Sequence, residues 1–167
     1  MSDEDDFLPG TIERRDHGFE GRLTRRYDQA PAAVWAMLTE PRHLAKWLAP
    51  GTIELRRGGA VRIDFADSGI VIDSTVTALE PQRTLEYSWG SSAQPERPIR
   101  WELAAEAGGT RLTLTVRLPG DEDMAKACAG FEGHLTMLAA ALEDVPVRFP
   151  LDLYLRARKH YQTLLDA

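Results

Sequence analysis

Residues 31–50, "PAAVWAMLTEPRHLAKWLAP", carry a tryptophan on each side of Pro41, and this stretch decides the fold. A proline inside a helix removes a backbone donor and clashes with the preceding turn. The stretch therefore predicts two short helices that meet at a bend near Glu40, the second beginning at Pro41. Each helix has one apolar face, which carries Trp35 in the first and Trp47 in the second. Neither helix is long enough to be stable alone, so both must pack on another part of the chain.

Outside this stretch, residues 19–118 contain short segments in which apolar and polar side chains alternate. One such segment precedes the two helices, at residues 19–28. Six more follow them, at residues 53–55, 61–65, 70–80, 85–89, 99–103 and 112–118. Turn residues, and not helices, separate these six segments. Short strands connected in this way are typical of an antiparallel sheet.

The period changes after Asp121. Apolar residues then recur at intervals of three and four, at Met124, Cys128, Phe131, Leu135, Leu138 and Leu142. This spacing predicts a long amphipathic helix. An antiparallel sheet with one apolar face needs a cover, and the long helix would supply it.

The last 24 residues, 144–167, are expected to form a linker with two prolines and an additional helix. The apolar side of that helix is expected to contain Leu151, Tyr154, Leu155, Tyr161 and Leu165. The back of the long helix is lined by small residues, which allow a neighbouring element to approach closely. We expect the additional helix to pack there; the alternatives are a second subunit in a homodimer and an alanine-rich face that is simply exposed.

The net charge of −6 argues against nonspecific affinity for nucleic acid or for an anionic membrane. No apolar run approaches membrane-spanning length, and the N-terminus lacks the features of a secretory signal. The single cysteine, Cys128, excludes an internal disulfide and fits a reducing compartment. We therefore expect a cytoplasmic protein that binds neither nucleic acid nor membrane, with residues 1–17 forming a flexible acidic tail.

Four motifs in the same order resemble bacterial homologues of the activator of the heat-shock protein 90 ATPase, in the START-like or SRPBCC superfamily. They are "APAAVWAMLTEPRHLAKWL" (30–48), "EPQRTLEYSW" (80–89), "GGTRLTLTVRLPG" (108–120) and "GFEGHLTMLAAALE" (130–143). Phe131 stands where the family commonly has tryptophan. The resemblance covers residues 19–143, and the family pattern says nothing about the extension that follows.

The resemblance implies an α+β helix-grip fold, in which a curved antiparallel sheet surrounds the long helix. The START-like domain would span residues 18–143, with two short helices after its first strand and the extra C-terminal helix outside it. The family's relation to stress response would come with this assignment.

In such a fold the interior side chains either fill the core or line a ligand cavity. Candidates for the cavity are Trp35, Trp47, Leu48, Phe65, Tyr87, Trp89, Trp101, Phe131, His134 and Met137. We favour the core for Trp35, whereas Trp47 suits the core and the cavity mouth equally. His134 lies at the edge of the apolar stripe of the long helix, where it serves either as a structural histidine or as a polar group in the cavity.

The sequence contains no recognisable catalytic or metal-binding pattern. Its four histidines are scattered without the spacing of metal ligands, and Cys128 lies on an apolar stripe. We therefore expect no metal and no cofactor, and we favour a noncatalytic module that holds an apolar or amphipathic small molecule. The alternatives are a protein-interaction role like that of the chaperone activators and, ranked last, a cyclase or hydrolase that uses the cavity.

Overall fold

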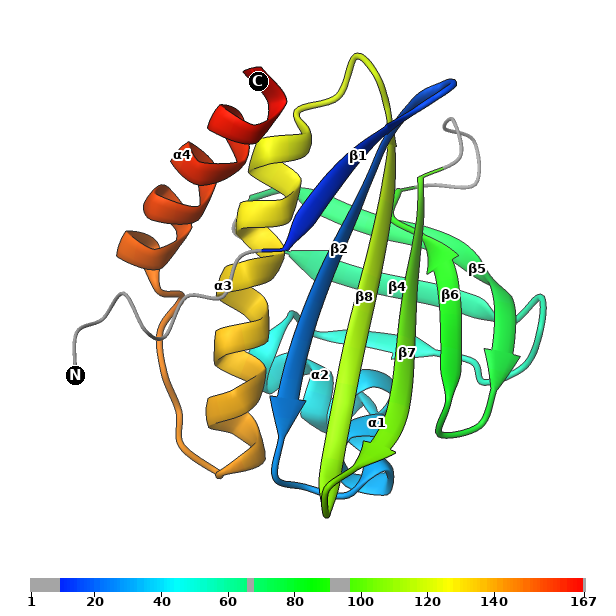
Figure 1. The fold of residues 1–167 in the computed structure, drawn as a ribbon. Coiled ribbons are helices and arrows are strands. Elements are labelled where there is room, and N and C mark those ends of the chain that lie inside the picture. The colour runs from blue at the N-terminus through cyan, green and yellow to red at the C-terminus, as the bar shows by residue number, and fades with distance from the viewer. Residues whose placement is uncertain (1–9, 66–67, 91–96, 167) are drawn as a thin grey trace.

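The computed structural model describes residues 10–65, 68–90 and 97–166, and within them a long helix lies in the concave side of a curved sheet (Figure 1). The strands are β1 (Thr11–Arg15), β2 (Gly18–Tyr27), β3 (Gly51–Ile53), β4 (Ala60–Phe65), β5 (Ile70–Glu80), β6 (Thr84–Ser88), β7 (Pro98–Glu106) and β8 (Gly109–Pro119). The helices are α1 (Pro31–Thr39), α2 (Pro41–Trp47), α3 (Met124–Leu142) and α4 (Leu151–Asp166).

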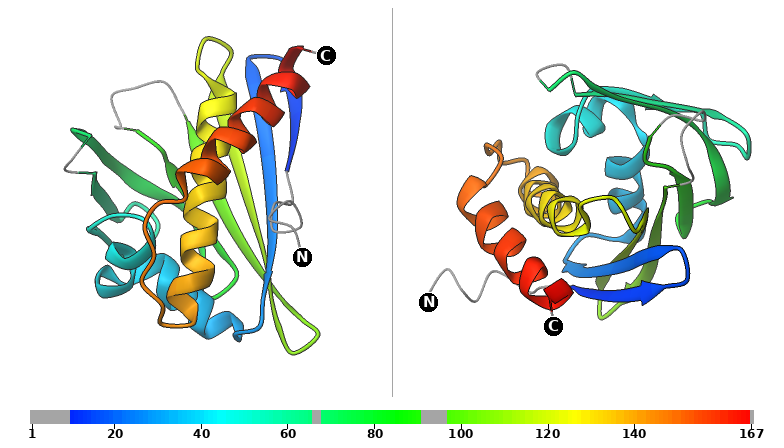
Figure 2. Two further views of the ribbon diagram at one scale, coloured as in Figure 1. Left: turned by 90° about the vertical axis from the view of Figure 1, so that its left-hand side faces the viewer. Right: turned by 90° about the horizontal axis from the view of Figure 1, so that it is seen from above.

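All neighbouring strands of the sheet are antiparallel, in the order β1-β2-β8-β7-β6-β5-β4-β3. The view from above shows the sheet curving around α3, with α1 and α2 beside it (Figure 2). Most of the strands at residues 18–119 and the long helix agree with the periods read from the sequence. The segment expected at residues 53–55 is an exception: β3 ends at Ile53 and Leu55 is exposed, because the chain already turns there, with the Arg56 N–H bonded to the Glu54 carbonyl oxygen. The α+β helix-grip fold is thereby confirmed.

The two short helices meet at Glu40, as the sequence predicts. Glu40 has an extended backbone, with φ −88° and ψ 132°, and it ends α1 and begins α2 at the same time. Pro31 and Pro41 each occupy the first turn of a helix, where the missing N–H has no intrahelical acceptor to lose. The apolar faces of both helices are buried, including Trp35 and Trp47.

Small residues let α3 approach the sheet closely. A Cβ atom on Gly21 of β2 would lie 2.7 Å from the Sγ atom of Cys128 and 2.7 Å from the Cε atom of Met124. A larger residue at position 21 would displace these two side chains of α3. At the start of the helix, the side chain of Asp123 caps α3 by accepting a hydrogen bond of 3.0 Å from the backbone N–H of Lys126.

The extension packs on the back of α3, so that α3 lies between α4 and the sheet (Figure 2). The buried face of α4 consists of Leu153, Ala157 and Tyr161. Leu151 and Leu155, which were expected on this face, are exposed, and that part of the prediction is wrong. The expected face was chosen by side-chain size, whereas the contact forms around Ala157, whose small side chain lets the two helices approach.

One further expectation needs correction. Residues 1–17 were expected to form a loose tail, but Thr11–Arg15 form strand β1 and pair with β2 from Arg22 to Gly18. The strand was missed because its segment, "TIERR", is mostly charged and lies at an exposed sheet edge. The first nine residues lie outside the described part of the chain. In the part that is described, no helix combines the length and the apolar character needed to cross a membrane.

Candidate functional site

A pocket of about 570 Å³ opens between α3, the β4–β5 hairpin and the extension. Its walls combine aromatic and aliphatic side chains with a few charged ones. They are formed by Phe65, Ser68, Ile70, Trp89, Arg97, Leu118, Glu122, Asp123, Lys126, Ala127, Gly130, Phe131, His134, Phe149 and Tyr154. A pocket of this size and character is typical of sites for small organic molecules.

Four of the ten cavity candidates line this pocket, and their rings form a continuous wall. The ring of Trp89 lies 5.9 Å from that of Phe65 and 5.1 Å from that of Phe131, between ring centres. The ring of His134 lies 6.0 Å from that of Phe65. These residues come from β4, from the position just after β6 and from α3, so the fold brings together three segments that are distant in sequence.

The other six candidates do not line the pocket. Trp35, Trp47, Leu48, Tyr87 and Trp101 belong to the buried core, and Met137 is partly buried against it. Trp47 in particular is only 1% exposed. Its indole Nε1–H donates a hydrogen bond of 2.7 Å to the carbonyl oxygen of Met37, and its ring packs edge-on against Trp101. Trp47 therefore holds α2 against the core and α1, and it does not form the cavity mouth.

His134 is the polar group on the aromatic wall. Its Nδ1 atom lies 2.8 Å from the carbonyl oxygen of Trp47. Because a carbonyl can only accept a hydrogen bond, Nδ1 must carry a proton. Burial lowers the pKa of His134 below its usual value, and the bond to the Trp47 carbonyl offsets part of that change. The ring is thus neutral near pH 7, with Nε2 as a hydrogen-bond acceptor.

Charged side chains stand at the other end of the pocket, around the beginning of α3. Arg97 faces Glu122 at 3.8 Å, and Arg158 of α4 faces Asp123 at 3.3 Å. Lys126 lies eight residues before His134, which corresponds to about 12 Å along a helix. The pocket therefore has an aromatic end and a charged end.

The wall that the extension contributes was not predicted from the sequence. Phe149 lies in the linker before α4, and its ring is 5.2 Å from that of His134 and 5.8 Å from that of Tyr154. It packs over Gly133, where an added Cβ would lie 2.6 Å from the Phe149 ring. The two glycines in "GFEGHL" could have indicated this wall, because Gly133 leaves room for the Phe149 ring and Gly130 leaves room for the pocket.

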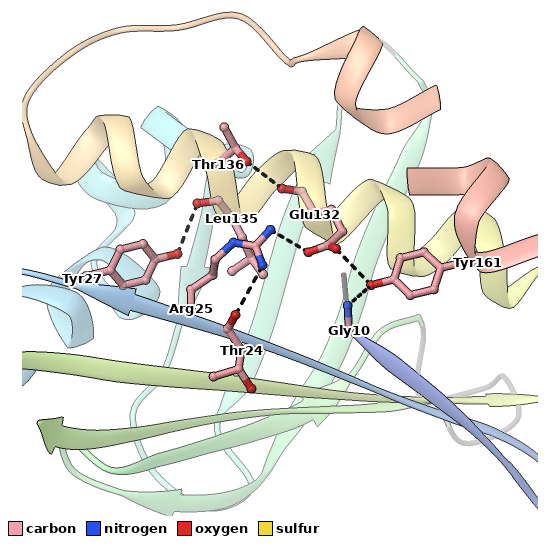
Figure 3. A network of polar contacts seen from close by, with 8 residues as sticks. All are labelled: Gly10, Thr24, Arg25, Tyr27, Glu132, Leu135, Thr136 and Tyr161. Carbon is pink, nitrogen blue, oxygen red and sulfur yellow. Dashed lines mark hydrogen bonds and ion pairs between the residues drawn. The ribbon is translucent and has the colours of Figure 1, made fainter. Parts of the chain in front are cut away.

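A second polar cluster, also missed, lies between α3, α4 and β2 (Figure 3). Glu132 is fully buried there, and its carboxylate accepts hydrogen bonds from Arg25 at 2.7 Å and from the Tyr161 hydroxyl at 3.0 Å. Burial raises the pKa of Glu132, while Arg25 and Tyr161 oppose the rise. Both oxygens of the Glu132 carboxylate are hydrogen-bonded to protein groups. The cluster therefore links α3, α4 and β2 and is not open to a ligand.

Two other features were considered as sites. A larger hollow of about 960 Å³ lies at the β1–β2 turn, but its walls are mainly exposed charged side chains such as Arg14, Asp16 and Arg117. It is a surface concavity that offers little apolar area to a ligand.

Burial raises the pKa of the Cys128 thiol to about 12, so this cysteine is not a nucleophile at neutral pH. Among the described residues, no group of three or more His, Cys, Asp or Glu side chains is arranged to hold a metal ion.

Comparison of the sequence with known protein families gives a match. Residues 28–143 match the model of the family described as "Activator of Hsp90 ATPase homolog 1-like protein". This match confirms the resemblance drawn from the four motifs. No curated protein matches the sequence.

Solved structures share the fold over most of the chain. CalU16 from Micromonospora echinospora has a TM-score of 0.79 and 20% sequence identity, covering 95% of this chain and 98% of that one. A protein from Bordetella parapertussis, encoded by gene BPP1335, has a TM-score of 0.71 and 26% identity, covering 92% and 89%. DynU16, described as "a putative protein in the dynemicin biosynthetic locus", has a TM-score of 0.69 and 29% identity, covering 78% of this chain and 49% of that one.

Proposed function

The chain belongs to the Activator of Hsp90 ATPase homolog 1-like family, and we propose that it binds an aromatic, amphipathic small molecule in the pocket beside α3. The observation that carries this proposal is the wall of rings formed by Phe65, Trp89, Phe131 and Phe149 around about 570 Å³ of space. Phe65, Trp89 and Phe149 remain partly exposed, whereas Phe131 is buried behind them. Exposed ring surface gains free energy when an apolar ligand covers it.

The charged end of the pocket favours an amphipathic ligand over a purely apolar one. Lys126 stands near the start of α3, about two turns before His134, and Arg97 lines the same end of the pocket. A ligand with a ring system at one end and a polar group at the other would match both ends. Pockets with mainly apolar walls and a few placed polar groups are the common form of small-molecule sites.

Binding without catalysis fits the distribution of titratable groups. At the aromatic end of the pocket, His134 is the single imidazole or carboxyl group among the described lining residues. Acid–base catalysis by two side chains would need a second group within hydrogen-bond reach of the same reacting centre. The carboxylates of Glu122 and Asp123 lie at the charged end, on the far side of Lys126 from His134. The location of the DynU16 relative in a biosynthetic locus supports a small organic ligand.

Gly130 allows a direct test, because it lines the pocket and an added Cβ would meet no atom within 4 Å. Gly130→Phe should fill the pocket from α3 without displacing a neighbour. Gly130→Ala is the matched control, since one methyl group leaves most of the volume free. The wild type and both variants should be screened against fatty acids, sterols, quinones and aromatic polyketides by thermal shift, with bound ligands identified by native mass spectrometry.

A ligand at a hundred times its dissociation constant should stabilise the wild type by about 2.7 kcal/mol. The Gly130→Ala variant should show the same stabilisation, and Gly130→Phe should lose it while remaining folded. Equal binding by all three proteins would place the ligand elsewhere. The absence of binding across the panel, together with no ligand retained on purification, would contradict the proposed function.

A further inference from the structure

We propose that His134 selects the ligand by accepting a hydrogen bond at Nε2, so that the pocket prefers hydroxylated aromatic molecules over their analogues without a hydroxyl group. This inference rests on the proposed binding function and adds the chemical class of the ligand. The orientation of the His134 ring, the partners of its two nitrogens and the surrounding pocket walls support this inference.

The orientation of the His134 ring is determined by the backbone of α2. Its Nδ1–H donates to the carbonyl oxygen of Trp47 at 2.8 Å. That carbonyl belongs to the last residue of α2, and the Trp47 side chain is itself anchored by its 2.7 Å bond to Met37. Because the proton is held on Nδ1 by a rigid acceptor, the lone pair of the neutral ring is on Nε2.

The Nε2 atom has no hydrogen-bond partner among the described residues. The side chain lines the pocket, and its nearest ring neighbours are Phe65 at 6.0 Å and Phe149 at 5.2 Å. These hydrocarbon rings offer no donor. In the free protein, water can reach an acceptor in a half-open pocket, but a bound ligand displaces that water.

The identity of the displacing group then decides the affinity. A ligand that covers Nε2 with a C–H group leaves a desolvated acceptor without a partner, which costs binding free energy. A ligand that presents an O–H group replaces the lost water and avoids this cost. Sites that hydrogen-bond a substrate hydroxyl reject the analogue that lacks it for this reason. The flat walls of Phe65, Phe131 and Phe149 favour an aromatic carrier for the hydroxyl group.

The test compares 2-naphthol with 2-methoxynaphthalene, which share a ring system and differ in the hydrogen-bond donor. Isothermal titration calorimetry at neutral pH should give the wild type an affinity for 2-naphthol about tenfold or more above that for the methyl ether. In His134→Phe, which keeps an aromatic ring and removes the acceptor, the two affinities should become equal. His43→Phe is the matched control, because His43 does not line the pocket, and it should keep the preference.

Nitrogen NMR of the histidine rings gives a readout that does not depend on any variant. In the free wild type, His134 should show the tautomer with the proton on Nδ1. 2-Naphthol should shift the Nε2 resonance in the direction of hydrogen bonding, whereas 2-methoxynaphthalene should not. Equal affinities for the two probes, with no shift at Nε2, would overturn the inference and leave the binding function standing. If neither probe binds and the Gly130 screen is also blank, the binding function fails and this inference fails with it.

Discussion

The hydroxyl of Tyr161 on α4 donates a hydrogen bond of 3.0 Å to the carboxylate of Glu132, which is fully buried on α3 (Figure 3). The same hydroxyl accepts a hydrogen bond of 2.7 Å from the backbone N–H of Gly10, just before β1. One phenol group therefore joins the extension to the long helix and to the start of the sheet. Because the extension also supplies Phe149 and Tyr154 to the pocket, this bond helps to position a wall of the candidate site.

We predict that Tyr161→Phe destabilises the protein by about 1–3 kcal/mol in urea unfolding. The substitution preserves the ring but leaves one Glu132 oxygen and the Gly10 N–H without their partner. Tyr154→Phe is the control, because the Tyr154 hydroxyl makes no hydrogen bond with another described residue. Equal stabilities of the two variants would mean that the phenol bond contributes nothing.

The ion pair between Arg25 and Glu132 leads to a second prediction. Both side chains are largely removed from water, with 12% and 0% exposure, and their atoms lie 2.7 Å apart. Glu132→Gln leaves a buried guanidinium without its carboxylate, and we expect a loss of about 3–5 kcal/mol. The double variant Arg25→Met and Glu132→Gln should be more stable than the sum of the two single effects predicts, because it removes both charges. Additive effects in this double-mutant cycle would contradict a direct coupling.

Two glycines on the same helix should respond to alanine in opposite directions. Gly130→Ala should stabilise the protein by up to about 1 kcal/mol, because alanine favours the helix and its methyl group enters open space. Gly133→Ala should destabilise it, since the new methyl group would meet the Phe149 ring at 2.6 Å. Thermal unfolding of both variants measures the difference. If Phe149 rests on α3 as described, Phe149→Ala should remove most of the penalty of Gly133→Ala.

Most of the fold could be predicted because its signals are local. The bend at Glu40 follows from Pro41, and strands β2 and β4 to β8 follow from alternation between turns. Strand β1 could not be predicted in this way, because an edge strand of charged residues such as Arg14 and Arg15 has no apolar alternation. The packed face of α4 was also missed in part, since the contact depends on the small side chain of Ala157 and not on the large ones of Leu151 and Leu155.

The site could be predicted only in part, because a pocket is the volume that the packed side chains do not fill, and the sequence does not show where that volume lies. Phe65, Trp89, Phe131 and His134 were chosen for facing the interior, and so was Trp47, which proved to be core. Periodicity gives the direction of a side chain but not whether another side chain fills the volume in front of it. The position of Phe149 could not be predicted for a different reason. The linker has no helical or strand periodicity that would indicate which element the Phe149 side chain contacts. Glu132 was overlooked because a carboxylate beside an apolar stripe is usually exposed, and its partners Arg25 and Tyr161 lie far away in sequence.

The last prediction concerns the pH dependence that His134 imposes. Burial lowers its pKa below the usual value of 6.5, so between the two values the unfolded chain binds a proton that the folded protein does not. The free energy of unfolding therefore rises with pH through this window. The contribution of His134 to stability is complete above about pH 6.5 and is lost progressively as the pH falls below it.

Urea unfolding of the wild type and of His134→Phe, from about pH 7.5 to about pH 5, isolates this contribution. His43 also has a pKa lowered by burial, but it is present in both proteins and cancels in the difference. The charged pocket residues Arg97, Glu122, Asp123 and Lys126 are likewise common to both. We expect the wild type to lose stability relative to the variant as the pH falls.

The preference for 2-naphthol should weaken over the same range, because a protonated Nε2 no longer accepts a hydrogen bond. Parallel stability curves with an unchanged ligand preference would show that His134 is not the neutral acceptor that its contact with Trp47 implies.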